Sequence, residues 1–186
     1  ADPVATGLRN TSSTAAGGPG VFNDRFNLLH LLDDPLRLHS PLGRLAEDMD
    51  TFYTQARGMV DNPAVAQAFR FSTADSQRYG NNGFGNACLI AKQVLAANQG
   101  TRYIQITLGG WDMHQDIYDA TDGLPPRAKI LDDGLAALLG DLQAGGQLGE
   151  TLVVMLGEFG RTVGPLSGDG GRDHFLQHFA MFAGAG

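Results

Sequence analysis

The feature that most constrains the fold of this chain is an uninterrupted apolar run at residues 151–156, Thr-Leu-Val-Val-Met-Leu. A short apolar run without polar alternation is typical of a strand that is buried on both faces of a sheet. A second β-prone run lies at residues 102–108, and the stretch between the two runs follows helical spacing from a pair of prolines to a pair of glycines. Strand, helix and strand in this order predict a βαβ unit over residues 102–156, with parallel strands and a right-handed crossover.

The rest of the chain favours an α/β fold with a partial doubly wound, mostly parallel sheet and a helical N-terminal half. Ser40-Pro41 and Asn62-Pro63 are helix starts, because a capping side chain precedes proline at the first helical position. Asn86 is expected to cap a further helix that stops at Gly100, and residues 179–182 have a strand pattern. The expected organisation is a loop or arm with an irregular lead-in at 1–39 and a partial α/β domain at 40–186, divided into a helical part at 40–98, a βαβ core at 102–156, and a loop with a strand at 157–186.

Composition excludes several classes of protein. The chain has 186 residues and a net charge of −7 without any basic run or stripe, so a nucleic-acid partner is not expected. No stretch approaches about 18 uninterrupted apolar residues, so a transmembrane segment is not expected. The single cysteine, Cys88, excludes an internal disulfide framework, and its place in an apolar helical stripe predicts a core position.

Side chains that can bind a metal gather in the loops next to the predicted strands. In a doubly wound sheet, ligands bind beyond the carboxyl ends of the strands, so these loops are expected to meet at one edge. Their mixture of imidazole and carboxylate groups suits a divalent metal such as zinc or calcium. The candidate metal ligands are Asp112, His114, Glu158, Asp173 and His174.

Two arginines in the same loops are candidates for binding an anionic substrate. Arg161 can hold an anionic group through its planar guanidinium, or it can simply pair with Glu158, and Arg172 is a candidate for the same substrate role. The ligand candidates also have structural alternatives, as loop hydrogen bonds or as surface side chains. Their joint occurrence in three separate loops favours the metal site. His178, four residues after His174, is assigned to packing at the start of the last strand.

Several motifs resemble one bacterial family. They are Gly-Gly-Trp-Asp-Met-His at 109–114, Thr-Leu-Val-Val-Met-Leu-Gly-Glu-Phe-Gly-Arg-Thr at 151–162, and Gly-Arg-Asp-His at 171–174 followed by Ala-Gly-Ala-Gly at 183–186. On these motifs, residues 40–186 resemble the domain-of-unknown-function family 1501, which consists of sulfatase-like proteins placed in the alkaline phosphatase superfamily.

The resemblance implies an α/β domain of the alkaline phosphatase/sulfatase type, of which this chain is an internal fragment. It also implies export to the periplasm or the cell surface. In that superfamily a sheet edge binds two metals, commonly zinc, or one calcium, through Asp and His ligands. The resemblance places the nucleophile (Ser, Thr or formylglycine) outside this chain, so the fragment alone is expected to be inactive. The remaining parts of the same protein, or an oligomer partner, are expected to cover the sheet.

The sequence departs from the superfamily pattern at two positions. Glu158-Phe159 stands where the superfamily usually has Asp-His, and Asp112-x-His114 is tighter than its usual Asp-x-x-x-His. A phenylalanine cannot bind a metal, so two interpretations stay open. One is a metal-dependent hydrolase of phosphate or sulfate esters, with an anionic ester as substrate. The other is a non-catalytic exported binding or surface protein that retains the fold.

Overall fold

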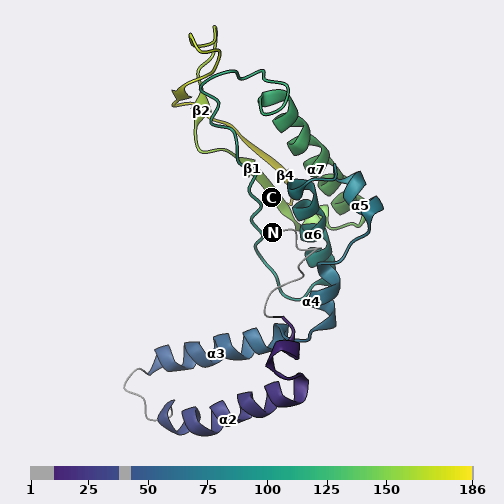
Figure 1. Ribbon diagram of the computed structural model, residues 1–186, viewed down its shortest axis with the longest axis vertical. Coiled ribbons are helices and arrows are strands. Elements are labelled where there is room, and N and C mark those ends of the chain that lie inside the picture. The colour runs from purple at the N-terminus through teal and green to yellow at the C-terminus, as the bar shows by residue number, and fades with distance from the viewer. Residues whose placement is uncertain (1–10, 38–42, 186) are drawn as a thin grey trace. The chain divides into compact units, whose positions relative to one another are not determined.

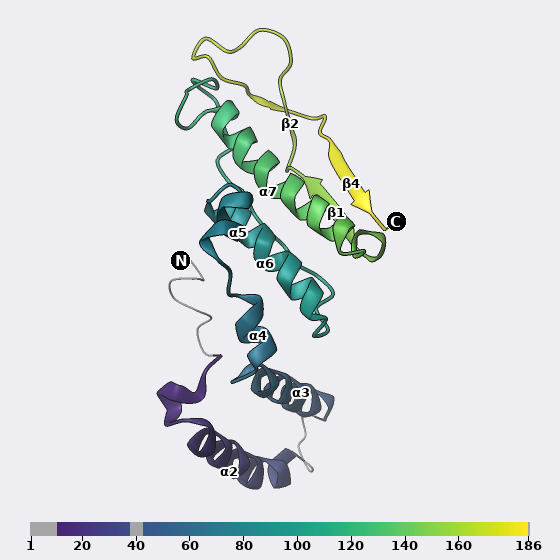
Figure 2. The ribbon, with the colours of Figure 1, turned by 90° about the vertical axis from the view of Figure 1, so that its right-hand side faces the viewer.

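A computed structural model describes residues 11–37 and 43–185 of the chain. The chain divides into two compact units, Ala1–Arg70 and Phe71–Gly186. Figure 1 and Figure 2 show their elements in two views that differ by a turn of 90°. The second unit carries every residue that the sequence predicts as a metal ligand or substrate-binding group.

The first unit is helical throughout its regular elements. They are η1 (Ser13–Ala16), α2 (Pro19–Arg37), α3 (Arg44–Met59) and α4 (Pro63–Ala68). Helix α2 corrects the expectation of an irregular segment at 1–39. Its half-buried side chains include Phe22, Phe26 and His30, which recur every four residues along one helix face. Arg57 of α3 lies over the Phe26 ring at 4.8 Å and donates to Oδ1 of Asn23 at 2.9 Å, so side chains of α3 stabilise this face of α2.

The amphipathic pattern that would predict α2 is weak in the sequence, because apolar residues lie on both sides of the helix. Leu28, Leu31 and Leu32 are exposed, and Pro35 lies inside the helix. Despite these apolar side chains, none of the helices in the described part of the chain combines the length and apolar character that a membrane crossing requires.

The second unit combines helices with short strands. Its elements are α5 (Thr73–Arg78), α6 (Gly83–Ala97), α7 (Leu124–Ala144), η2 (Leu148–Glu150), β1 (Leu152–Leu156), β2 (Gly160–Arg161), β3 (His174–Phe175) and β4 (Ala180–Gly184). Helices α6 and α7 lie side by side in both views (Figures 1 and 2). The buried core cluster is formed by Tyr79, Cys88, Leu89, Leu138 and Leu142. The predicted core position of Cys88 and the predicted helix between the two β-prone runs, which is α7, are therefore confirmed.

Capping side chains account for the starts of four helices, η1, α4, α5 and α6. Asn62 caps α4 through its side-chain oxygen, which confirms the predicted start at Pro63. Helix α6 starts earlier than predicted, because Asn82 rather than Asn86 accepts the hydrogen bond from a free N–H group of the first turn. The helix also ends earlier, at Asn98 in a left-handed conformation, instead of at Gly100. The start predicted at Ser40-Pro41 lies outside the described residues.

The strands pair antiparallel where the structure describes them. Strand β1 pairs with β4 in a register that sets Val154 opposite Phe182, so the apolar runs at 151–156 and 179–182 are confirmed as strand-forming. Residues 102–108 carry no strand, although Ile106 packs against the core cluster. A segment becomes a strand only when a neighbouring backbone accepts and supplies its hydrogen bonds. The parallel pairing is therefore not formed in this structure, and the doubly wound sheet stays a prediction.

Within the described part of the chain, one face of the β1–β4 sheet is exposed. Val153 packs against the core cluster, whereas Val154 and Leu156 are 42% and 64% exposed. Phe182 of β4, on the same face as Val154, is 66% exposed. The apolar run is thus covered on one face instead of the expected two. Its cover by further parts of the protein, or by an oligomer partner, remains a prediction.

Candidate metal centre

The candidate site is formed by two segments that lie far apart in the sequence. One is the loop between α6 and α7, which carries Asp112 and His114, and the other is the hairpin of β2 and β3. The hairpin sets Arg161 directly opposite His174 across its two strands. The backbone N–H of Arg172 donates to the carbonyl oxygen of Met113 at 2.9 Å, which fastens the loop to the hairpin.

A close backbone contact at Gly171 fixes the position of His114. A Cβ atom on Gly171 would lie 1.9 Å from the carbonyl carbon of His114, so a side chain cannot be accommodated there. The hydroxyl of Ser167 donates to the carbonyl oxygen of His114 at 3.3 Å, and Gln115 forms an isolated antiparallel bridge with Gly170. The backbone around His114 is therefore held by contacts on both sides of the residue.

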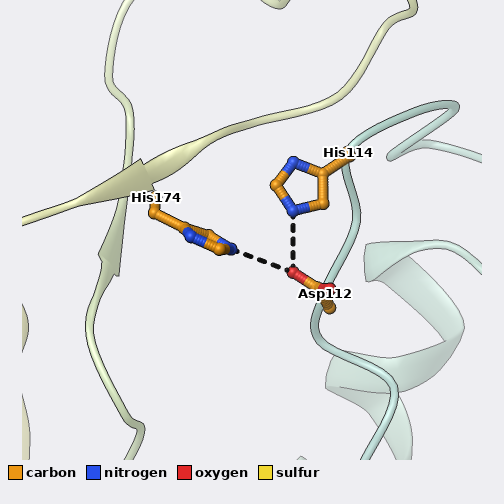
Figure 3. A group of neighbouring side chains, drawn as sticks. All are labelled: Asp112, His114 and His174. Carbon is orange, nitrogen blue, oxygen red and sulfur yellow. Dashed lines mark hydrogen bonds and ion pairs between the residues drawn. The ribbon is translucent and has the colours of Figure 1, made fainter.

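Three of the five predicted ligands converge. Nε2 of His114 lies 2.9 Å from Oδ1 of Asp112, and Nε2 of His174 lies 3.3 Å from the same oxygen. Figure 3 shows both imidazole rings directed at the Asp112 carboxylate, one from the loop and one from the hairpin. The ligand atoms of the three residues lie within 4.8 Å of one another. The group is open to solvent, because the three side chains are 67%, 43% and 55% exposed in chain order.

The spacing of these atoms suits a zinc ion. Ligand atoms at about 2.0–2.1 Å from one zinc, at tetrahedral angles, lie roughly 3.3 Å apart. The two separations at Asp112 are close to this value, and all three ligand atoms lie within 4.8 Å of one another, so the three residues can fill three positions of a tetrahedron. The fourth position would stay open, as in catalytic zinc sites. Calcium prefers six to eight oxygen ligands, so two imidazoles favour zinc over calcium.

The structure places Asp173 behind a ligand instead of among the ligand atoms. Its Oδ1 lies 3.0 Å from Nδ1 of His114, the ring nitrogen that does not face Asp112. A carboxylate in this position orients the ring and directs Nε2, which also lies 3.5 Å from Nη1 of Arg161, toward the ligand group. Asp173 is held there by Thr162, whose backbone N–H donates to its carbonyl oxygen at 2.9 Å and whose hydroxyl accepts from its N–H at 3.2 Å.

Arg161 donates a hydrogen bond to the oxygen of Asp112 that faces the two histidines. Its Nη2 donates to Oδ1 of Asp112 at 2.7 Å. This hydrogen bond, followed by the one from His174, holds the pKa of Asp112 below its usual value of 3.8. Asp112 is therefore ionised at neutral pH, which a metal ligand requires. Nη2 of Arg161 also lies 3.7 Å from Oε1 of Glu158, so Glu158 pairs with the arginine, as the structural alternative predicted.

Arg172, the other residue predicted to bind substrate, forms a hydrogen bond within the hairpin instead. Its Nη1 donates to the carbonyl oxygen of Thr162 at 2.5 Å. The hairpin also positions Phe159, which the sequence marked only as a residue unable to bind metal. The Phe159 ring lies 4.3 Å from the His174 ring, and the guanidinium of Arg161 lies over it at 5.3 Å. The available sequence signal is the spacing of two residues between 159 and 161, at the start of the short strand β2.

A second group of ligand-type side chains lies in the first unit and was not predicted. Nδ1 of His30 lies 3.0 Å from Oδ1 of Asp34 and 3.9 Å from Oδ1 of Asp50. The spacing of four residues between His30 and Asp34 is the available sequence signal, because it sets both on one helix face. Such a pair also forms without a metal, as an ordinary ion pair along a helix.

Comparison with known proteins gives one match. A family model described as "Protein of unknown function (DUF1501)" matches residues 5–186, which is nearly the whole chain. No curated protein and no solved structure matches the chain.

Proposed function

The chain belongs to the DUF1501 family, and on this premise we propose that it is a sulfatase-like, alkaline-phosphatase-like protein that hydrolyses phosphate or sulfate esters with a divalent metal. The observation that carries the proposal is the convergence of Asp112, His114 and His174, with Asp173 behind His114. Zinc is the metal that this donor set favours. The sequence motifs that resemble the alkaline phosphatase superfamily support the same class of reaction.

The side chains of the site have distinct roles in this proposal. Asp112, His114 and His174 hold the metal, which supplies Lewis acidity toward an ester oxygen. Asp173 orients His114 through Nδ1. Arg161 neutralises the anionic ester group, because its planar guanidinium matches the oxygens of a phosphate or sulfate. The same resemblance supports the proposal that the protein is exported to the periplasm or cell surface.

The first test is a zinc titration of the chain by isothermal titration calorimetry. One zinc per chain is expected, with binding weakened at least tenfold in His174→Ala and in Asp112→Asn. His178→Ala is the matched control, because His178 lies in the same segment and outside the group of three ligands. Absence of zinc binding, or equal losses in His174→Ala and His178→Ala, would contradict the proposal. Hydrolysis of p-nitrophenyl phosphate and p-nitrophenyl sulfate, with and without zinc, by the whole protein that contains this chain and the nucleophile expected outside it, then distinguishes the two ester classes.

A second candidate function is a non-catalytic binding or surface protein built on the same fold. The contact of Phe159 with the His174 ring favours it, because an apolar ring occupies a place beside the ligands where the superfamily usually has a histidine. Zinc binding by the intact protein without turnover of either ester would support this second function over the first.

A further inference from the structure

We propose that Arg161 competes with the metal for Asp112, and that metal binding releases the guanidinium to bind a tetrahedral oxyanion. The inference rests on the metal site of the proposed function and adds an order to it: metal first, anion second. An oxyanion therefore binds only to the metal-loaded protein, and it strengthens metal binding in return.

The competition follows from the contacts of a single oxygen atom. Oδ1 of Asp112 receives Nη2 of Arg161 at 2.7 Å, which is closer than Nε2 of His114 at 2.9 Å or of His174 at 3.3 Å. This oxygen is also the one that Nε2 of both histidines faces, so a cation held between the two histidines would meet it first. A cation about 2 Å from Oδ1 and a guanidinium nitrogen in its present place would lie within about 5 Å of each other. Two positive groups at that distance repel, so a bound cation displaces the guanidinium.

The displaced guanidinium stays next to the site, because it also has contacts that do not involve Asp112 and the side chain is mostly buried. Arg161 is only 21% exposed, compared with 67% for Asp112. Its guanidinium lies over the ring of Phe159, and Nη1 donates to the carbonyl oxygen of Arg172 at 3.4 Å. Freed from Asp112, Nη2 is available to a ligand that reaches the metal. An oxyanion that contacts both the cation and the guanidinium satisfies both charges.

Glu158 is the internal alternative to such an anion, and it is a weak one. Its Oε1 lies 3.7 Å from Nη2 of Arg161, and its side chain is 67% exposed. Exposed ion pairs at this distance contribute little stability. A phosphate or sulfate group bound to the cation is therefore a stronger partner for Arg161 than Glu158 is.

A second arginine–aspartate pair in the same unit shows what a permanent pair looks like. Arg78 donates through both Nη1 and Nη2 to the two oxygens of Asp141, which is only 17% exposed and also accepts from the hydroxyl of Tyr79. The pair of Arg161 and Asp112 differs in each respect: the guanidinium offers Asp112 one nitrogen, the carboxylate is exposed, and two imidazoles share its oxygen. These differences favour an exchangeable contact.

The experiment measures zinc and inorganic phosphate binding to the whole chain by calorimetry, with sulfate as a second anion. In the wild-type chain, phosphate is expected to bind only after zinc, and phosphate is expected to raise the apparent zinc affinity by the same factor, as linkage requires. Arg161→Gln is expected to raise zinc affinity in the absence of anion by about 2- to 5-fold, the range for loss of an exposed ion pair, and to lose zinc-dependent phosphate binding. Arg102→Gln, an exposed arginine elsewhere in the unit, is expected to change neither.

Each outcome supports or overturns the inference. Arg161→Lys, which keeps the charge and loses the planar fork, is expected to retain the competition with zinc and to weaken phosphate binding. If circular dichroism shows that Arg161→Gln is folded and its zinc affinity is unchanged, the inference is overturned, whereas the proposed zinc site is not. Equal phosphate binding with and without zinc overturns it as well. Failure of the wild-type chain to bind zinc overturns the proposed function, and this inference with it.

Discussion

Nδ1 of His114 lies 3.0 Å from Oδ1 of Asp173, on the edge of the ring that faces away from Asp112. The two carboxylates therefore approach opposite nitrogens of one imidazole. A neutral ring can donate through only one of these nitrogens, so a proton held toward Asp173 leaves the other nitrogen as a lone pair facing the ligand group. This relationship makes Asp112 and Asp173 unequal, although the sequence presents both as carboxylates next to a histidine.

Removing the orienting carboxylate should weaken metal binding without removing a ligand. Asp173→Asn is expected to lower zinc affinity about 10- to 100-fold, the usual effect of losing a partner behind a metal-bound histidine. The measurement is a zinc titration with a competing chelator. Asp169→Asn, an acidic residue in the same loop, is the control and should leave the affinity unchanged. An unchanged affinity in Asp173→Asn would show that His114 needs no such partner.

A methyl group at Gly171 should disturb the site through the backbone. Gly171→Ala puts a carbon 1.9 Å from the carbonyl carbon of His114 and must push the loop and the hairpin apart. We expect a loss of about 1–3 kcal/mol in the free energy of unfolding and a parallel loss of zinc affinity. Gly168→Ala is the matched control, because nothing lies within 4 Å of its added carbon. Similar effects of the two substitutions in denaturant titrations would contradict the close contact.

The half-buried Asp141 should stabilise the second unit in a pH-dependent manner. Its bidentate pair with Arg78, and then the Tyr79 hydroxyl, lower the pKa of Asp141 below 3.8. A carboxyl whose pKa is lower in the folded state stabilises the fold above its unfolded pKa, and this stabilisation is lost as the pH falls through the lowered value. Asp141→Asn is therefore expected to lower the free energy of unfolding by about 1–2 kcal/mol at pH 7. A larger loss is not expected, because Arg78 is 49% exposed and solvent weakens the pair.

Denaturant unfolding at several pH values measures this effect. The difference between wild type and Asp141→Asn should shrink below about pH 4 and vanish at lower pH. Asp132→Asn, on an exposed position of α7, should leave stability unchanged within about 0.5 kcal/mol. A pH-independent difference for Asp141→Asn would contradict a role for the ionised carboxylate.

Cys88 should be unreactive while the chain is folded. Burial raises the pKa of its thiol to about 12, and the residue is 1% exposed. The thiolate is the reactive form, so a thiol reagent such as 5,5′-dithiobis(2-nitrobenzoic acid) is expected to react slowly at pH 8 and quickly in denaturant. Cys88 is the single cysteine, so the signal belongs to it alone. Fast labelling of the folded chain would show that the core around α6 opens readily.

Local signals determined several elements in both units. The prolines and glycines at the two ends of α7, the cap at Asn62 and the apolar stripe that contains Cys88 act over a few residues, so they are readable without tertiary structure. The boundaries of α6 were less readable, because two asparagines, Asn82 and Asn86, compete as caps and geometry selects the first. Helix α2 was harder to predict, because apolar residues lie on both sides of it and the Arg57 contacts with its half-buried face come from another helix.

The sequence by itself also determined which residues are candidates for chemistry, since Asp112, His114 and His174 stand out by residue type and by their place beside strand-like runs. Only the tertiary structure decided their roles. It directs two imidazoles at one oxygen of Asp112, sets Asp173 behind His114, turns Arg172 into the hairpin and lays Arg161 over Phe159. The physical reason is that residue type and spacing act along the chain, whereas a ligand geometry depends on where distant backbones meet. Here that meeting depends on the hairpin of β2 and β3 and on the missing side chain of Gly171.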